Sequence, residues 1–433
     1  MPARLQHVDD PAAAGNGFAV AFFDFADVFE DFYPRFGVDQ AAFARTWRGS
    51  GNHAWLSLIQ KELGTVSWYV LSLAPEVTPT THDSGVRVTF VRSSRVHRWL
   101  WHLQYTSRHS WRLRRFYRAY ATVASYAAPL SLSLVRALRK GGCDLILVQD
   151  YSSGRFDVLY ALARLLRKPL VAYHSGSTPA DVVGRTARRW TLPRADHLIL
   201  SSARERASLE RRFRLRPAKT SVVLTPVDTG SFRPLDRDRA LASLGLPADR
   251  RYLLFAGRLD DRVKRVSALV RAFASVAADH DDARLLVAGD GPDRGTLRDL
   301  AHELTGDKVV FLDWVEDSDA LVALYNAADA LVLPSLREGF PTVVGEAISC
   351  GLPVIASDVG GASELVVPGR TGSLIPGGDE RALADALADV LEHRAHWAGM
   401  RAHARALAEE RVAEPVVAAQ LRSIFSGVTE RRP

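Results

Sequence analysis

The sequence predicts an α/β protein with two doubly wound domains, each built on a parallel sheet. From Cys143 to Ser202, apolar runs of strand length alternate with segments of helical character. This pattern is typical of parallel strands with helices on both faces. The same alternation restarts at Arg251. With 433 residues, the chain is long enough for two domains that each have a complete core.

The order of the segments gives a domain plan. Residues 1–16 lack an apolar core segment, so we expect a flexible tail there, with neither a signal peptide nor a membrane span. We expect an N-terminal domain over residues 17–230 and a charged, proline-bearing linker over residues 231–250. A C-terminal domain over residues 251–412 and a final helix within residues 413–433 complete the plan.

Composition limits the class of protein. A hydrophobic content of 47% and a charged content of 24% are ordinary for a soluble globular protein. The two cysteines, Cys143 and Cys350, are too few for a disulfide framework and lack metal-ligand spacing. We therefore expect a reducing, cytoplasmic location. Arginine carries most of the positive charge, and the net charge is +7.

One stretch combines a buried strand, a tight loop and a helix start. The apolar run Ala330–Ser335 predicts a buried parallel strand. Gly339 allows the backbone to approach a ligand, and Pro341 has the fixed φ of a first helical residue. The free N–H groups of Thr342 and Val343 should then point out of the carboxyl end of the strand, where they would hold an anion.

Two carboxylates flank this helix start. Glu338 lies in the loop and Glu346 lies about one turn inside the helix. Carboxylates beside an anion site do not bind phosphate, but each accepts hydrogen bonds from the hydroxyls of a sugar or a ribose. The alternative is a capped surface helix with two solvated acids. The position directly after a buried strand favours a binding site.

Three further side chains follow predicted strands. Arg258 and Lys264 lie six residues apart after the strand in Arg251–Asp260, where two cations would neutralise a diphosphate leaving group. Solvated turn charges are the alternative. His174 ends another predicted strand and could transfer a proton or bind a ligand hydroxyl. A structural histidine is the alternative at that position.

The spacing of Glu338 and Glu346 resembles the Glu-x7-Glu signature of the family 4 retaining glycosyltransferases, which have the GT-B fold. This fold implies two facing domains and a final helix, here at about Pro415–Phe425, that crosses back to the first domain. The resemblance implies that Glu338 and the following loop hold the donor sugar, that Glu346 holds the ribose, and that His174 lies close to the reacting sugar. In this sequence Ser175 follows His174, and Arg265 follows Lys264, where many relatives have Gly. The implied donor-binding set is Gly339, Phe340, Pro341, Thr342, Val343 and Glu346, with Val315 at the base.

The resemblance also implies a function. A sugar would pass from a nucleotide-diphosphate donor, bound by the second domain, to an acceptor hydroxyl on the first domain, with retention of configuration and without a metal or other cofactor. The Asp-x-Asp patterns at residues 236–238 and 317–319 read as helix caps and linker charges rather than metal ligands. Two alternatives stay open: another GT-B enzyme, such as a phosphorylase or a nucleotide-sugar epimerase, and a non-catalytic protein that binds a membrane surface.

A basic stretch hints at the acceptor. Residues 84–142 contain no Asp or Glu, twelve basic residues and interleaved aromatic residues. Such a composition suits an anionic membrane surface, while a solvated helix face with core aromatics is the equal alternative. We expect no nucleic-acid partner. A lipid-linked saccharide or another sugar acceptor would fit polysaccharide or glycolipid synthesis by an enzyme peripheral to the inner face of the membrane.

Overall fold

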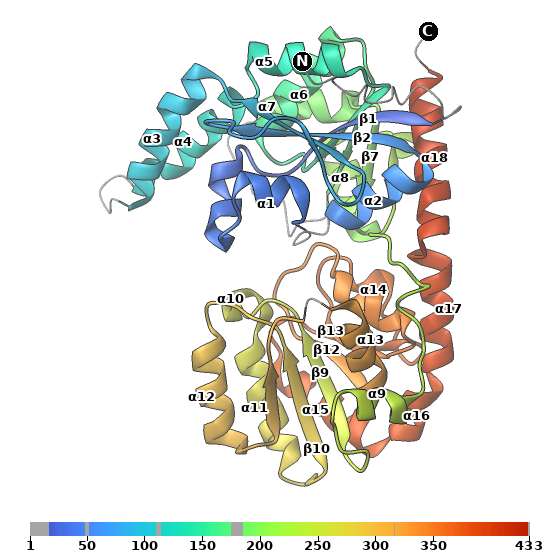
Figure 1. Ribbon diagram of the computed structural model, residues 1–433. Coiled ribbons are helices and arrows are strands. Elements are labelled where there is room, and N and C mark those ends of the chain that lie inside the picture. The colour runs from blue at the N-terminus through green and yellow to red at the C-terminus, as the bar shows by residue number, and fades with distance from the viewer. Residues whose placement is uncertain (1–16, 48–51, 110–113, 175–184, 316, 432–433) are drawn as a thin grey trace, which may run out of the picture.

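The computed structural model describes residues 17–47, 52–109, 114–174, 185–315 and 317–431. Figure 1 shows two α/β domains, one above the other, and a long helical segment along one side. The first sheet has eight strands and the second has six. The two parallel-sheet domains predicted from the alternating pattern are confirmed, whereas residues 1–16, expected to be a tail, lie outside the described residues.

The N-terminal sheet has the strand order β3-β4-β2-β1-β5-β6-β7-β8. All neighbours pair in parallel except β3 and β4. The strands are β1 (Phe18–Phe23), β2 (Gly64–Ser72), β3 (Thr80–Thr81), β4 (Arg87–Arg92), β5 (Leu145–Gln149), β6 (Leu170–Tyr173), β7 (His197–Leu200) and β8 (Thr220–Val222). Every residue of β5, β6 and β7 is buried, as expected for a sheet covered on both faces.

Helices connect these strands, and two of them project from the domain. The helices are α1 (Gln40–Arg45), α2 (Asn52–Glu62), α3 (Arg95–His109), α4 (Arg114–Ala127), α5 (Leu132–Gly141), α6 (Gly154–Leu165), α7 (Arg185–Thr191) and α8 (Ala203–Phe213). Figure 1 shows α3 and α4 as a pair that extends beyond the edge of the sheet. This pair lies within the acid-free stretch.

The C-terminal sheet is entirely parallel, with the order β11-β10-β9-β12-β13-β14. Its strands are β9 (Arg251–Ala256), β10 (Ala283–Ala288), β11 (Val309–Leu312), β12 (Ala330–Leu333), β13 (Val354–Ser357) and β14 (Gly372–Ile375). The helices of this half are α9 (Arg237–Ser243), α10 (Asp261–Lys264), α11 (Val266–Ala277), α12 (Arg294–Thr305), α13 (Ser318–Ala327), α14 (Thr342–Ser349), α15 (Glu380–Glu392), α16 (Arg394–Gly399) and α17 (Arg401–Arg411).

The last helix, α18 (Glu414–Thr429), returns to the first domain. Its side chains Val417, Leu421 and Phe425 are fully buried and belong to the core of the N-terminal sheet. The ring of Phe425 packs edge-on against that of Phe18, with 5.6 Å between ring centroids. The crossover helix expected from the sequence is confirmed, and it is longer than the segment Pro415–Phe425 that the sequence predicts.

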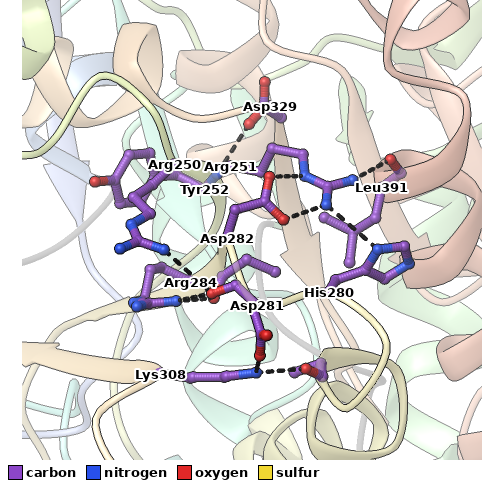
Figure 2. Close-up of polar contacts among 12 residues, drawn as sticks. Arg250, Arg251, Tyr252, His280, Asp281, Asp282, Arg284, Lys308, Asp329 and Leu391 are labelled. Atoms are coloured by element: carbon purple, nitrogen blue, oxygen red, sulfur yellow. Dashed lines mark hydrogen bonds and ion pairs between the residues drawn. The ribbon is translucent and has the colours of Figure 1, made fainter.

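The amino end of the C-terminal sheet carries a dense polar network (Figure 2). Arg251 begins β9, and its guanidinium group forms a two-pronged ion pair with Asp282, which directly precedes β10. The same group donates to the carbonyl of Leu391. Asp329, directly before β12, accepts the backbone N–H of Tyr252 at 2.9 Å. Because parallel strands begin at one edge, these charges saturate one another and stabilise the start of the sheet.

No single helix within the described ranges has both the length and the apolar character needed to cross a bilayer. One bent pair, formed by residues 121–127 and α5, meets the criteria of length and composition.

Candidate functional site

The predicted site residues of the second domain follow the carboxyl ends of β9 and β12. These two strands are neighbours in the sheet, so the segments after them emerge side by side. A backbone hydrogen bond from Leu336 to the carbonyl of Val263, 2.8 Å long, ties the two segments together. Ligands of open parallel sheets bind at such carboxyl ends.

Lys264 and Glu338 meet at the centre of this region. Lys264 closes the single turn of α10, and its Nζ lies 2.6 Å from Oε1 of Glu338. The two side chains are 21% and 10% exposed, so the pair is largely shielded from water. Partial shielding strengthens the attraction between the charges relative to a surface pair. The structure thus brings together two residues that are 74 positions apart in the sequence.

Helix α14 begins immediately after this pair. The helix starts at Thr342, and Pro341 is its N-cap residue with extended backbone angles. Our expectation that Pro341 is the first helical residue is therefore wrong by one position. Its backbone is extended, and only its carbonyl takes part in the helix, by accepting the N–H of Val344 at 3.0 Å. Gly339 and Phe340 are buried. The N–H groups of Thr342 and Val343 remain at the first turn, where a helix attracts an anion.

A glycine-bearing segment after β13 supports the loop before α14. Gly360 has φ +57, and a Cβ atom there would lie 2.2 Å from the carbonyl oxygen of Glu338. The N–H of Gly361 donates to the carbonyl of Gly339 at 2.6 Å. Any other side chain at Gly360 would push this loop away. The segment therefore fixes the position of the loop that carries Glu338.

Glu346 is half-buried inside α14. The hydroxyl of Tyr325, a fully buried residue of α13, donates to Glu346 Oε2 at 2.7 Å. Burial raises the pKa of the Glu346 carboxyl above its ordinary value, while the hydrogen bond from Tyr325 opposes the shift. One carboxylate oxygen is thus fixed by the protein, and the other oxygen, Oε1, is the one that can accept a ligand hydroxyl.

Arg258 and Val315 lie at the ends of β9 and β11. Arg258 is exposed in the turn that leads to α10. Val315 is half-buried and packs against the apolar core of the domain. The structure places both residues beyond carboxyl ends of the same sheet as Glu338, in agreement with the expected order along the chain.

His174 lies in the other domain, directly after β6. Its ring is buried, and Nδ1 lies 2.7 Å from Oε1 of Glu205, which is on α8. Burial lowers the pKa of this histidine, but the hydrogen bond and the charge of Glu205, helped by Asp150, outweigh it, so the pKa is raised above its ordinary value. The sequence did not single out Glu205.

The start of α8 contacts the second domain. Arg204 forms a two-pronged ion pair with Asp358, at 2.8 and 2.9 Å. The backbone N–H of Ala203 donates to Glu364 Oε1 at 2.7 Å. A Cβ atom on Gly361 would lie 2.8 Å from the carbonyl oxygen of Ser201. The segment that carries Glu205 therefore touches the segment that supports Glu338.

Chemically, the arrangement offers a cation, an oriented carboxylate and a helix start within one edge of a sheet. These groups suit a ligand that has both a diphosphate and several hydroxyls. Within the ranges that the structure describes, no three His, Cys, Asp or Glu side chains are grouped in a way that could hold a metal ion. Asp236 and Asp317 cap α9 and α13 through their side chains, as the sequence indicated.

Two family models match the chain. The model described as "Glycosyl transferases group 1" matches residues 236–410, and the model described as "Glycosyltransferase Family 4" matches residues 66–231. Together they span both domains and include Glu338, Glu346, Arg258 and Lys264 in the first match and His174 in the second.

Curated relatives agree with these matches. The D-inositol 3-phosphate glycosyltransferase 1 of Catenulispora acidiphila is 34% identical over 286 residues, which is 61% of this chain and 68% of the relative. The D-inositol 3-phosphate glycosyltransferase of Thermobispora bispora is 33% identical over 265 residues. That alignment covers 59% of this chain and 61% of the relative.

Solved structures resemble the whole chain. HepE of Anabaena in complex with UDP has a TM-score of 0.70 and 19% identity, covering 94% of this chain and 99% of that one. A sucrose-phosphate synthase from Thermosynechococcus elongatus has a TM-score of 0.69 and 22% identity, covering 96% and 100%. At these identities the likeness concerns the fold.

Proposed function

The chain belongs to glycosyltransferase family 4 and has the GT-B fold, and from this premise we propose how its residues move a hexose from a nucleotide-diphosphate donor to an acceptor hydroxyl with retention. The observation that carries the proposal is the Lys264–Glu338 contact of 2.6 Å beside the first turn of α14. A cation, a carboxylate and free helix N–H groups at one strand end match the diphosphate and the sugar of such a donor.

The leaving diphosphate determines the chemistry at this end. Lys264, Arg258 and the N–H groups of Thr342 and Val343 stabilise the negative charge that develops as the bond to the sugar breaks. Glu338 holds the sugar through its hydroxyls, and Glu346 accepts the ribose hydroxyls with the oxygen that Tyr325 does not occupy. The acceptor hydroxyl would attack the sugar on the face from which the diphosphate departs and pass its proton to the leaving diphosphate, so the configuration would be retained.

His174 serves the sugar side of the reaction. Its position after β6, in the domain whose helix α8 contacts the second domain, supports this role. With Nδ1 bound to Glu205, the imidazole has Nε2 left for a substrate hydroxyl. The acceptor would bind to the first domain, in line with the usual division of work in the family.

The acceptor and the location follow from the acid-free stretch. Helices α3 and α4 project from the domain (Figure 1), and Val96, Trp99, Leu130 and Leu132 are more than half exposed. Apolar side chains among basic residues favour binding to an anionic bilayer. We therefore place the enzyme on the inner face of the membrane, where a lipid-linked saccharide would be its acceptor in polysaccharide or glycolipid synthesis.

A thermal-shift panel with UDP, GDP, ADP and TDP, each with and without EDTA, tests the donor site. One nucleotide should stabilise the folded protein by about 2.7 kcal/mol at 100 times its Kd, with no change in EDTA. UDP is bound by HepE and is the first nucleotide to try. Lys264→Ala should lose most of the shift. An absence of any shift for every nucleotide would contradict the proposal.

Co-sedimentation with vesicles tests the membrane part separately. We expect the full chain to pellet with vesicles that contain anionic phosphatidylglycerol and to stay in solution with neutral phosphatidylcholine vesicles. Trp99→Ser should weaken the binding, while Trp314→Ser, which changes an exposed tryptophan of the other domain, should not. Equal binding to both kinds of vesicle would remove the anionic surface from the proposal.

A further inference from the structure

A buried acidic residue supports His174. Glu205 is the third residue of α8, and both of its carboxylate oxygens are bound inside the N-terminal domain. Oε1 accepts hydrogen bonds from Nδ1 of His174, at 2.7 Å, and from the hydroxyl of Tyr151. Oε2 accepts from the backbone N–H and from the hydroxyl of Ser201, at 3.1 and 2.9 Å. A carboxylate with four donors has a single well-defined position.

The usual structural role of such a residue does not account for these contacts. Ser202 caps α8, since its hydroxyl accepts the N–H of Glu205 at 3.1 Å. In a capping box, the carboxylate three residues later would return to the backbone N–H of the cap. Here Oε2 binds the N–H and the hydroxyl of Ser201, one residue before the cap, and Oε1 binds His174 and Tyr151. The helix is therefore capped by Ser202 without the Glu205 side chain, and Glu205 Oε1 is bound to the histidine.

We infer that Glu205 is the positioning residue for His174, holding its imidazole by Nδ1 so that Nε2 is directed to the reacting sugar and its acceptor. This inference rests on the role proposed above for His174. The same segment connects to the donor half, because Arg204 and Ala203 contact Asp358 and Glu364 of the second domain. Glu205 would thus fix the histidine relative to the donor as well as within its own domain.

The electrostatic environment supports the inference. Among the described residues, the titratable groups that face His174 are Glu205 from α8 and Asp150 and Tyr151 from the segment after β5. Burial lowers the pKa of His174, and Glu205 reverses this effect. In turn, burial raises the pKa of Glu205, but the hydrogen bonds from His174, Tyr151 and Ser201 lower it below its ordinary value. With neutral Gln at position 205, only Asp150 would still oppose the effect of burial, so the pKa of His174 should fall.

A double-mutant cycle tests the inference. We expect Glu205→Gln to lower kcat at least about tenfold, with the KM for the donor unchanged because Glu205 does not touch the donor segments. His174→Gln should lower kcat by a similar or larger factor. If Glu205 acts through His174, the double variant should be no slower than His174→Gln alone. Losses that multiply in the double variant, or wild-type kcat in Glu205→Gln, would overturn the inference.

The matched control is Glu210→Gln on the same helix. Glu210 also binds two donors, Thr220 at 2.6 Å and Arg206 at 2.8 Å, but does not contact His174. It should keep wild-type kcat, and an equal loss there would indicate general damage to α8. The thermal shift with the nucleotide should persist in Glu205→Gln and His174→Gln. Its absence in the wild type would mean instead that the proposed donor site is wrong.

The pH dependence gives a readout that a purely structural role would not change. The His174 signal can be followed by NMR of the full chain labelled with 13C at histidine Cε1, and assigned by its absence in His174→Gln. In Glu205→Gln its pKa should be lower, and the matching limb of the kcat–pH profile should move to lower pH. An unchanged pKa and an unchanged limb would overturn the inference.

Discussion

The two ends of the C-terminal sheet use the same kinds of charged side chain for different purposes. At the amino end, Arg251, Asp282, Lys308 and Asp329 lie at or directly before four strands, and they bind one another, backbone carbonyls or a backbone N–H (Figure 2). At the carboxyl end, Lys264 and Glu338 form one ion pair beside a helix start.

The difference teaches how one sheet separates stability from function. A network with several bonds per charge is rigid and has little capacity left for a ligand. In the proposed mechanism, a single pair beside helix N–H groups exchanges partners: the diphosphate would offer Lys264 a stronger anion, and the sugar would offer its hydroxyls to Glu338. We therefore expect substitutions at the amino end to change folding, and substitutions at the carboxyl end to change turnover.

The largest expected effect is the loss of turnover in Lys264→Ala. Removing the cation next to the leaving diphosphate should lower kcat at least about 30-fold, equivalent to about 2 kcal/mol of transition-state stabilisation. The fold should persist, because the Leu336–Val263 backbone bond still joins the two segments. Lys308→Ala, at the amino end, is the matched control and should keep wild-type kcat. Steady-state kinetics with circular dichroism would measure both, and full activity in Lys264→Ala would remove this residue from the mechanism.

The converse effect is expected for Arg251→Ala. This change removes the ion pair with Asp282 and the hydrogen bond to the carbonyl of Leu391, which is buried and loses this donor. The free energy of unfolding should fall by about 1.5–2 kcal/mol, while kcat per folded molecule stays unchanged. Urea denaturation would measure the loss. Arg250→Ala, whose guanidinium lies at the rim of the same network, should cost about 0.5 kcal/mol or less. Equal losses of unfolding free energy in the two variants would mean that Arg251, at the centre of the network, stabilises the fold no more than Arg250 at its rim.

The sequence predicted the parts of the fold and of the site that depend on local pattern. Alternating apolar runs predicted the parallel sheets, because each strand and helix buries its own face. The apolar run Ala330–Ser335, followed by Gly339 and Pro341, predicted a loop and a helix start. Glu338 lies in that loop and Glu346 lies about one turn inside α14. The contact of Lys264 with Glu338 became visible only when β9 and β12 were seen to be neighbours.

Other features could not be predicted because their partners lie far away or their local pattern has a simpler explanation. The sequence Ser202-Ala203-Arg204-Glu205 is that of a capping box, which hides the contact with His174. Arg265 has φ +56, a left-handed conformation that a sequence signals only through glycine. Glycine, which the family resemblance implies at this position, would adopt that conformation without a side-chain penalty.

Glu346→Gln should show that a residue of the proposed site lowers the stability of the folded protein at high pH. Because burial raises the pKa of Glu346, the folded protein binds a proton between that raised pKa and the ordinary one near 4.5. The residue's contribution to stability is therefore present at low pH and is lost as the pH rises through the raised pKa. At pH 8, Gln should leave the protein equally or more stable while weakening nucleotide binding about tenfold. Melting temperatures and nucleotide titrations at pH 8 would decide, and a destabilised variant with unchanged affinity would contradict the expectation.

The smallest effect is expected at Arg265, a residue that affects stability but directly follows the site residue Lys264. A side chain in the left-handed region costs about 1 kcal/mol, and the ion pair of Arg265 with Glu380, 2.8 Å long, offsets part of that cost. Arg265→Gly removes the strain with the pair, whereas Arg265→Ala removes the pair and keeps the strain. The Gly variant should therefore be more stable than the Ala variant, by up to about 1 kcal/mol. Arg271→Ala, which removes another partner of Glu380 from a regular helix, gives the cost of the pair alone. An Ala variant at least as stable as the Gly variant would show that the backbone at Arg265 is not strained. Contacts other than those of its side chain would then set its conformation.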